Sequence, residues 1–492
     1  MESFSLTRRS FLQAAGIGAS ALATGSLAQV LGNRNDVHLR LISQAASLPI
    51  LPGNLTNAYR YTGSLRMGPR GTVQNLSSCI GPIIRLESGQ NVQIDHLNSL
   101  TENTVVHFHG MNVPELADGH PKDVLAPGEL HSHRFRVINR AGTYWFHPHP
   151  DMRTGYQVHR GMAGMMIVHD AEERALGLPS GACDVPVVIQ DKRFNASNQF
   201  QHSTGSQTGH LGSRILINGF ADYVWNCGTR LYRFRFLNGC NSRILKLAWD
   251  DGQPMTVIGT DGGLLSEPVV KPYVMLGPGQ RIEVIGDFTT KSVGSQIKLK
   301  SLAYLNGGPG SGTPPQGTEM DLMVCNVNYQ TPESVTIPSI LTPIVRYDRN
   351  AAVNAATPRM FATEYMNGMW TINGRTFEML EVADEEKVRL NDLEVWEMRN
   401  DLPADQFQPH PMHLHGPMFQ IHKRWTNEDT AWYETISEGY VDEGWHDTVL
   451  LFPGERAEFM LKFGPYPGLF LMHCHNLEHE DMGMMRNYQI LP

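Results

Sequence analysis

The residues best suited to chemistry lie near the C-terminus. They are a histidine–cysteine–histidine run followed by a histidine and a methionine, namely His473, Cys474, His475, His479 and Met484. In an extended strand, side chains alternate between two faces, so the Cys474 thiol points to one face and the flanking imidazoles to the other. A blue, electron-transferring copper site needs two histidines and one cysteine in a plane, with a weak axial methionine. The run supplies three of these four ligands, and its flanking histidines would serve a second metal site across the strand.

Three further histidine clusters precede this run. They are His107-Phe108-His109, His147-Pro148-His149, and the segment His410-Pro411-Met412-His413-Leu414-His415. Each His-x-His pair places two imidazoles on one face of a strand, and imidazole is a preferred copper ligand. A buried free cysteine beside ordinary histidines would explain one isolated run, but it does not explain four such clusters.

The elements that must position these residues repeat along the chain. A strand followed by an Asn-centred turn occurs at Val92–Asn98, Leu231–Asn238 and Leu393–Asn400. A Pro-Gly turn follows later in each copy, at Ala126–Glu129, Gly277–Gln280 and Phe452–Glu455. Alternating apolar and polar residues with this punctuation are typical of β-sandwiches. The repeat predicts three domains, at about residues 45–175, 180–335 and 345–492.

The spacing shows which clusters correspond. His147 follows Gly128 by 19 residues, and His473 follows Gly454 by the same 19 residues. The pair that begins at His147 therefore takes the place in the first domain that the cysteine run takes in the third. The other first-domain pair likewise matches the pair after the Asn turn of the third domain. Facing each other, the four pairs predict a cage of eight imidazoles around a trinuclear metal cluster.

The two other corresponding strands lack part of the ligand set. The second domain has Lys246 and Ala248 in the matching strand, so it has lost the metal-binding pair. The first domain has Pro148 where the third domain has Cys474. Only the third domain can therefore build the site that needs a thiolate.

The four clusters, in this order, resemble those of the three-domain multicopper oxidases, which include laccases, spore-coat laccases, bilirubin oxidases and bacterial cuprous oxidases. The resemblance covers nearly the whole chain after residue 45. It implies an all-β fold of three cupredoxin-like Greek-key β-sandwich domains. It also implies four copper ions, one of type 1, one of type 2 and two of type 3.

The resemblance implies a role for each cluster residue. The type 1 copper would be bound by His410, Cys474, His479 and axial Met484. The type 2 copper would be bound by His107 and His413. The type 3 pair would be bound by His109, His147 and His475 on one ion, and by His149, His415 and His473 on the other. No ligand position departs from the family pattern, whereas the cell-division cupredoxins that have lost copper have replaced these residues.

The implied activity is one-electron oxidation of a small reducing substrate at the type 1 site. Cys474 then connects that site to the cluster, where dioxygen is reduced to water by four electrons. Oxygen reduction consumes protons, so acids are expected near the cluster. Asp118, nine residues after His109, and Glu480, directly after His479, match proton-relay positions of the family. A turn residue is the alternative for Asp118, and a solvated charge is the alternative for Glu480.

The reducing substrate is less well specified. An exposed edge of His410 would accept electrons from phenols, aromatic amines, bilirubin-like pigments, or ferrous or cuprous ions. Cuprous oxidases carry a long methionine- and histidine-rich insert in the third domain, whereas this chain has only four methionines there, Met360, Met366, Met369 and Met379. We therefore expect laccase-like oxidation of phenols and aromatic amines. The alternatives are a Cu(I) or Fe(II) oxidase in copper tolerance, and a periplasmic protein that sequesters copper.

Seven carboxylates precede Thr448 in the segment between Arg424 and Arg456, and this segment holds no lysine or arginine. They are Glu428, Asp429, Glu434, Glu438, Asp442, Glu443 and Asp447. They could flank the substrate mouth and favour cationic or aromatic donors, or form a solvated loop.

The N-terminus indicates export. Arg8 and Arg9 precede a mildly apolar stretch that ends at small residues near Ala28, as in a twin-arginine signal. We expect residues 1 to about 40 to be a signal and leader outside the fold, read by the twin-arginine export machinery, and the mature protein to be periplasmic. An amphipathic first helix is the alternative.

The composition limits the classes of partner that the protein can bind. The net charge of −9 argues against nucleic acid, and no apolar run is long enough to span a bilayer. The expected partners are O2 and a small reducing substrate, and the expected state is a monomer.

Besides Cys474 the chain has five cysteines, which could form one disulfide or remain buried free thiols. Five isolated histidines are expected at the surface, namely His131, His133, His202, His210 and His446.

Overall fold

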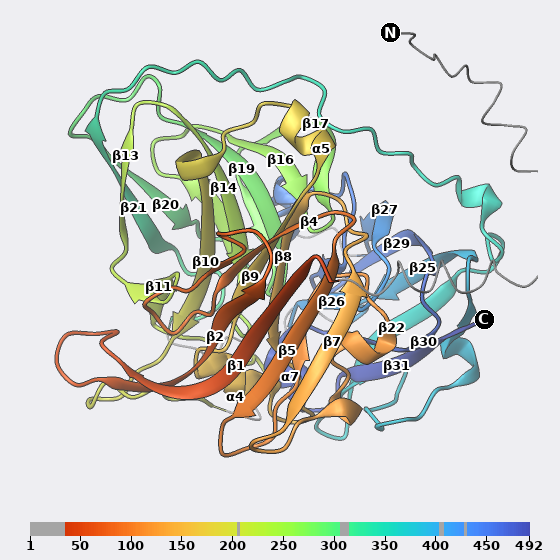
Figure 1. The fold of residues 1–492 in the computed structure, drawn as a ribbon. Helices are drawn as coiled ribbons and strands as arrows, with labels where there is room; N and C mark the ends of the chain where they lie inside the picture. Colours follow the sequence, from red (N-terminus) through yellow and green to blue (C-terminus); the bar gives the residue numbers. More distant parts are fainter. Residues whose placement is uncertain (1–34, 204–206, 306–313, 403–407, 428–430) are drawn as a thin grey trace, which may run out of the picture.

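The computed structural model describes residues 35–203, 207–305, 314–402, 408–427 and 431–492 (Figure 1). The export signal expected around Arg8 and Arg9 lies outside these residues, as do Glu428 and Asp429 of the acidic segment. Strands dominate the described chain, and the predicted all-β fold class is confirmed. Two sheets lie in each of three parts of the chain, which we call the first part (35–175), the second part (180–335) and the third part (345–492).

The first part contains a four-stranded and a five-stranded sheet. The four-stranded sheet has the order β2 (Thr56–Met67), β1 (Val37–Leu48), β5 (Asn91–Ser99) and β7 (Leu130–Arg136). The five-stranded sheet has the order β3 (Val73–Gln74), β4 (Ile83–Glu87), β9 (Gly164–His169), β8 (Gly142–Pro148) and β6 (Val106–His107). Their facing side chains form one apolar core.

The start of the first part differs from the prediction. Strand β1 begins at Val37 and pairs in parallel with β5, so the boundary expected at residue 45 and the leader expected to extend to about residue 40 are wrong. Val37, Leu39 and Leu41 are fully buried, and the residues between them are half-buried. This alternation is that of a strand with one face on the core, so residues 37–44 are structural.

The second part contains a seven-stranded and a five-stranded sheet. The larger has the order β12 (Phe220–Ala221), β11 (Arg214–Ile217), β10 (Asp184–Lys192), β14 (Leu231–Asn238), β19 (Arg281–Asp287), β16 (Met255–Thr260) and β17 (Gly263–Lys271). The smaller has the order β13 (Val224–Gly228), β21 (Met320–Tyr329), β20 (Gln296–Ser301), β15 (Leu245–Trp249) and β18 (Val274–Leu276).

The third part contains two five-stranded sheets. One has the order β23 (Met369–Ile372), β22 (Arg359–Met366), β25 (Leu393–Arg399), β29 (Glu455–Lys462) and β27 (Phe419–Thr426). The other has the order β24 (Lys387–Arg389), β31 (Met485–Leu491), β30 (Gly468–Cys474), β26 (His410–Leu414) and β28 (Thr448–Leu451). Strands β26 and β30 carry the histidine and cysteine runs.

The helices are short and lie between strands. They are α3 (Glu115–Asp118), α4 (Thr154–His159), α5 (Ala171–Ala175), α6 (Ala431–Glu434) and α7 (Leu477–Asp481). Helix α7 of the third part contacts α4 of the first, where the Asp481 carboxylate accepts hydrogen bonds from the Thr154 and Gly155 backbone N–H groups, both at 2.9 Å. A carboxylate at a helix N-terminus satisfies free N–H groups and opposes the helix dipole. Among the described residues there is no helix whose length and hydropathy would let it cross a bilayer.

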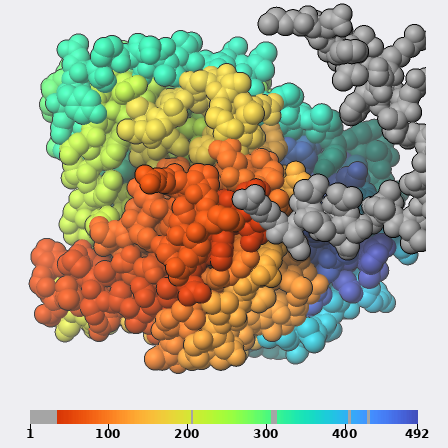
Figure 2. Space-filling view, viewed as in Figure 1, coloured from red at the N-terminus to blue at the C-terminus, as the bar shows by residue number. Residues whose placement is uncertain are grey.

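The three parts pack against one another. In the space-filling view the first part (red to orange) touches the second part above it and the third part (turquoise to blue) beside it (Figure 2). The segment between β21 and β22 runs across the top of the molecule from the second part to the third (Figure 1). All six cysteines fall within the described ranges and are buried and unpaired, so the free-thiol alternative holds.

Candidate metal centre

Four strands bring the His-x-His pairs together at the boundary between the first and third parts. Strand β6 pairs with β8 so that His107 lies opposite His147, and β26 pairs with β30 so that His413 lies opposite His473. The repeat predicted from spacing therefore corresponds to two equivalent strand pairs. We call the eight residues the histidine cage: His107, His109, His147, His149, His413, His415, His473 and His475. All eight are buried.

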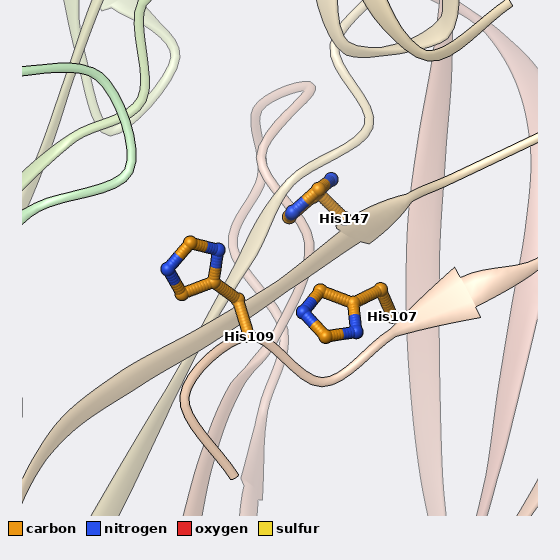
Figure 3. Close-up of side chains that lie close together, drawn as sticks. All are labelled: His107, His109 and His147. Carbon is orange, nitrogen blue, oxygen red and sulfur yellow. The ribbon is translucent and has the colours of Figure 1, made fainter. Parts of the chain in front are cut away.

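The first-part side of the cage is visible in Figure 3. His107 extends from β6, His109 from the loop that follows it and His147 from β8, and the three rings point toward one another. The ring centroids of His107 and His147 are 5.5 Å apart, and those of His109 and His147 are 5.7 Å apart. One ligand nitrogen from each of the three lies within 4.8 Å of the others, which is close enough to share a metal ion.

Histidines of the third part complete the cage. His109 stacks on His413, and His107 stacks on His415, each with ring centroids 3.7 Å apart. His475 lies 4.9 Å from His109 and 5.2 Å from His147, measured between ring centroids. These three are one of the predicted type 3 ligand sets.

The other predicted type 3 set is equally compact. The His149 ring centroid lies 4.9 Å from that of His473 and 5.2 Å from that of His415. Their ligand nitrogens also lie within 4.8 Å of one another. The structure thus brings both predicted triplets together across the boundary between the parts.

The donor set fits metal ions. The Nδ1 atoms of His107, His147 and His413 donate to the main-chain carbonyls of Asp118, Pro148 and Asp447, at 2.6, 2.9 and 2.9 Å. Their Nε2 atoms are buried and have no hydrogen-bond partner within the described chain. A donating Nδ1 leaves a lone pair on Nε2, and a carbonyl partner of this kind orients a metal-ligating imidazole. Buried polar atoms without partners are costly, so these nitrogens fit metal ligation.

Protonation of the rings is also suited to ligation. Burial lowers the pKa of most cage histidines, and it lowers that of His149 to about 4. Neutral imidazoles present lone pairs to a metal at neutral pH. The cage is therefore able to bind cations without first losing protons.

The two predicted acids are buried beside the cage. Asp118 Oδ2 lies 2.6 Å from His415 Nδ1, and Glu480 Oε2 lies 3.1 Å from His473 Nδ1. Both side chains are at most 2% exposed, so neither is a solvated surface charge. Burial raises the pKa of both carboxyl groups, well above the usual range for Asp118. The charge of a bound metal ion would oppose this rise.

Asp447, named above only as a carboxylate of the substrate mouth or of a solvated loop, is instead buried beside the cage. Its Oδ1 lies 3.1 Å from His109 Nε2, and its main-chain oxygen holds His413. Arg281 of β19, in the second part, donates to Asp447 Oδ1 at 2.9 Å and to Oδ2 at 2.5 Å. Burial alone would raise the pKa of Asp447, but Arg281 and His109 hold it well below its usual range. The sequence signal for this role was its position directly before β28, because β28 pairs with the histidine-bearing strand β26.

A second cluster lies on the opposite face of β30. His410 Nδ1 and His479 Nδ1 lie 3.4 Å and 3.8 Å from Cys474 Sγ, and 3.3 Å from each other. Met484 is buried in the same apolar cluster, and its main-chain oxygen accepts the Cys474 N–H at 3.1 Å. Met412, opposite Cys474 in β26, packs there too. We call His410, Cys474, His479 and Met484 the thiolate site.

The thiolate site also fits a metal ion. His479 Nε2 donates to the Gln207 carbonyl at 2.8 Å, which leaves its Nδ1 lone pair directed toward the sulfur. Burial raises the pKa of the Cys474 thiol, whereas a coordinated cation deprotonates a thiol outright. The backbone N–H of Asn476 approaches the sulfur at 3.4 Å, as suits a thiolate acceptor.

The prediction of an exposed His410 edge is wrong. Both imidazoles of the thiolate site are fully buried. Strand β23 places Trp370 over them, with its ring centroid 4.6 Å from that of His410 and 4.6 Å from that of His479. The sequence gives no local sign of this contact, because Trp370 is remote from both histidines along the chain.

Most of the histidines expected at the surface are not there. His133, His210 and His446 are buried, and His202 and His131 are half-buried. His202 Nε2 lies 2.8 Å from Glu478 Oε1, next to the thiolate site. A histidine without a neighbour in sequence can thus be covered by residues from distant segments.

Comparisons with known proteins agree with this geometry. Two family models described as multicopper oxidase match residues 67–173 and 351–492. The multicopper oxidase mco of Staphylococcus haemolyticus is 28% identical, over 92% of this chain and 88% of that protein. The laccase of Bacillus subtilis is 29% identical, over 83% of this chain and 88% of that protein.

Two further matches are a solved structure and a cell division protein. The crystal structure of the McoA multicopper oxidase from Aquifex aeolicus superposes with a TM-score of 0.79 at 30% identity, over 93% of this chain and 97% of that one. The cell division protein FtsP of Shigella dysenteriae is 27% identical over 99% of both chains.

Proposed function

Because this chain belongs to the multicopper oxidase family, we propose that it couples one-electron oxidation of phenols and aromatic amines to the four-electron reduction of O2 to water. One observation carries the proposal. Strand β30 supplies Cys474 to the Cys–His–His–Met site on one face and His473 to the eight-histidine cage on the other. We propose four copper ions, one at the thiolate site and three in the cage. Bound copper would supply the redox chemistry that these side chains lack.

The chain's own residues support such a coupling. Cys474 lies between His473 and His475, so β30 joins the two sites through a few covalent bonds. The carbonyls of Asp118, Pro148 and Asp447 fix the ring orientations before any substrate arrives. Burial of the whole centre excludes bulk water, which strengthens electrostatic interactions there.

A copper-storage role and a copper-free role are the non-enzymatic alternatives. A store would bind copper reversibly and beyond four ions, whereas an oxidase holds four and turns over. FtsP-like proteins share the family, but every ligand type of the predicted copper sites is present in this chain. Metal content of the purified protein, measured with oxygen uptake, distinguishes these cases.

We propose that Asp118 and Glu480 supply protons to the cage. Each carboxyl group lies within 3.1 Å of a cage histidine and is shielded from bulk solvent. We expect Asp118→Asn and Glu480→Gln to slow oxygen reduction by about a hundredfold, since a positioned acid contributes about 10²–10⁴-fold. The blue absorption of the resting protein should remain, and it should bleach during turnover as donor electrons accumulate at the thiolate site. Stopped-flow absorption with oxygen uptake measures both effects.

Asp123→Asn is the matched control for this test. Asp123 is half-buried near Asp118 in sequence, but it pairs with Lys122 rather than with a cage histidine. It should leave both measurements unchanged. If all three variants reduced oxygen at the wild-type rate, neither acid would be a proton donor.

Broad laccase-like activity is supported by the limited cover over the thiolate site. The β22–β23 hairpin is short, and the chain has no methionine- and histidine-rich insert in this region. Trp370, which is itself fully buried, covers the imidazoles, and the half-buried Tyr365 packs against Trp370 with ring centroids 4.8 Å apart. Donors would therefore be oxidised without touching His410, in contrast to the exposed edge that the sequence suggested.

A metal-ion oxidase is the second candidate, and the same hairpin favours it. Met360, Met366 and Met369 of β22 and β23 are 51%, 48% and 40% exposed. Thioethers are soft ligands that select Cu(I). Met366 and Met369 lie opposite each other next to the Tyr365–Trp370 pair, and exposed thioethers at this place would suit a cuprous substrate.

Added copper decides between the two candidates. We expect the four-copper protein to oxidise 2,6-dimethoxyphenol at the same rate with and without free Cu(II), because the phenol would deliver electrons through the aromatic cover of Tyr365 and Trp370 and would need no added metal as a relay. Met366→Leu with Met369→Leu should leave this rate unchanged. A rate that rises steeply with added Cu(II), together with Cu(I) oxidation that the double variant loses, would favour the metal-ion oxidase.

We also propose periplasmic export by the twin-arginine route. The signal receptor reads a pair of guanidinium groups, so replacing Arg8 and Arg9 by lysine should retain precursor in the cytoplasm. Cell fractionation with immunoblotting measures this, and replacing Arg34 and Arg40 by lysine is the control. Normal export of the Arg8/Arg9 variant would indicate another secretion route.

A further inference from the structure

A cavity of about 350 Å³ opens where the three parts of the chain meet. Its walls include Arg140 and Tyr144 of the first part and Tyr347, Trp445 and Lys462 of the third, with Gly262 of the second between them. The volume is that of a small-molecule site, and such sites are common at boundaries between domains. No histidine-cage or thiolate-site residue lines it.

The cavity wall carries two positively charged side chains, Arg140 and Lys462. None of its lining residues is acidic. Arg140 Nη2 donates to Thr342 Oγ1 at 2.5 Å, whereas its Nη1 is buried and has no partner among the described residues. Burial lowers the pKa of Arg140, and Tyr144, Glu172 and Asp170 offset this only in part. The positive charges of Arg140 and Lys462 on the cavity wall favour an anionic ligand.

The remaining walls are largely aromatic. Tyr347 and Trp445 meet edge to face, with ring centroids 5.4 Å apart and planes at 84°. Tyr144 and Phe463 line the same cavity. Aromatic rings pack well against a planar ring in offset or edge-to-face arrangements. Aromatic rings and cationic side chains therefore line the same cavity.

We propose that this cavity is a binding site for a planar aromatic anion, such as an aromatic carboxylate or sulfonate. The anionic group meets Arg140 and Lys462, and the ring packs against Tyr347 and Trp445. Because its lining excludes the thiolate site and Trp370, the site is distinct from the place where donors are oxidised. The proposal does not depend on the copper chemistry.

The cavity adjoins the loop that carries His109 of the histidine cage. Asn139, which lines the cavity, donates to the Gly110 carbonyl at 2.9 Å, and Gly110 follows His109. Trp445 precedes Asp447, the carboxylate beside His109, by two residues. A bound anion thus contacts residues that hold the loop of His109, which is a route by which it affects the cage without being oxidised.

Titration with a redox-inert probe tests the proposal. Naphthalene-2-sulfonate is added to the protein as purified, and heat is measured by isothermal titration calorimetry. We expect one molecule to bind per chain, about tenfold or more tighter than the neutral naphthalene-2-sulfonamide, and to weaken as salt is raised, since exposed charges are screened. Equal affinity for the anion and the neutral amide, or no binding at millimolar probe, would overturn the proposal.

The Lys462→Gln variant tests whether the probe binds in this cavity. Lys462 is exposed at the end of β29, so the change leaves the fold intact. It should weaken naphthalene-2-sulfonate binding about fivefold, the effect of one partly exposed charge. Arg140→Gln should weaken it further, with thermal unfolding as the check that the bond to Thr342 is not essential for folding.

Lys423→Gln is the matched control. Lys423 is also an exposed lysine of a third-part strand and lies over a tryptophan, Trp425, at 4.7 Å, but it does not line the cavity. Its replacement should leave probe binding unchanged. Equal weakening by Lys423→Gln and Lys462→Gln would show that the probe binds surface lysines in general, and the assignment to this cavity would fail.

Discussion

Cys474→Ser is expected to remove the blue colour completely and to reduce oxidation of organic donors to the background rate. The thiolate is both the ligand responsible for the intense visible absorption of such sites and part of the strand that joins the thiolate site to the cage. A serine hydroxyl is a poor ligand for copper of this kind, because soft thiolate ligands define the site. The measurements are the visible spectrum of the copper-loaded protein and oxygen uptake with 2,6-dimethoxyphenol.

Copper content and a second cysteine make this test specific. The Cys474→Ser protein should retain the copper of the histidine cage, since none of the eight cage histidines is changed. Cys325→Ser is the matched control, because Cys325 is equally buried but lies in the core of the second part. It should keep the colour and the rate. A Cys474→Ser protein with full visible absorption would show that Cys474 is not a copper ligand.

Arg281→Met is expected to destabilise the folded protein by about 3–5 kcal/mol, the typical effect of removing one partner of a buried ion pair. The Asp447 carboxylate would remain buried without its two guanidinium bonds. Arg281 also donates to the carbonyls of Thr143, Gly279 and Asp261, so the first and second parts lose bonds together. Chemical denaturation of the copper-free protein measures the loss.

Arg349→Met is the control for the ion pair. Arg349 makes a bidentate pair with Glu458, at 2.7 and 2.9 Å, but its side chain is 31% exposed. Pairs in contact with solvent contribute about 1 kcal/mol or less. A loss below about 1 kcal/mol in Arg281→Met would mean that the Arg281–Asp447 pair does not stabilise the fold. The copper affinity of the Arg281→Met protein should fall as well, because residues that orient metal ligands contribute about 10–100-fold to metal affinity.

The ligand types and the fold class were predictable because they depend on local geometry. A His-x-His pair presents two imidazoles on one face wherever it lies in a strand, and equal 19-residue spacings identify equivalent strands. The alternation of apolar and polar residues indicates β-sandwiches independently of what they pack against. The start of β1 was missed because the expected leader was extended past Val37, although the same alternation begins there.

Asp447 and Trp370 were not predictable in the same way. Asp447 meets Arg281 at a separation of 166 residues and His109 at 338. The carboxylates of the acidic segment have the same local chemistry, and only packing between the parts decides that Asp447 is buried beside Arg281 and His109. The cover of the thiolate site depends likewise on where the β22–β23 hairpin folds back.

The sequence by itself therefore determined the chemistry that this protein can bind: which residues offer imidazole, thiolate and thioether, and on which face of each strand. The tertiary structure decided how that chemistry is enclosed: which acid meets Arg281, which ring covers His410 and His479, and where Arg140 and Lys462 share a cavity. The physical reason is that the direction of a side chain follows from the backbone at that residue. Its burial and charge partners depend on contacts between segments that are remote in the chain.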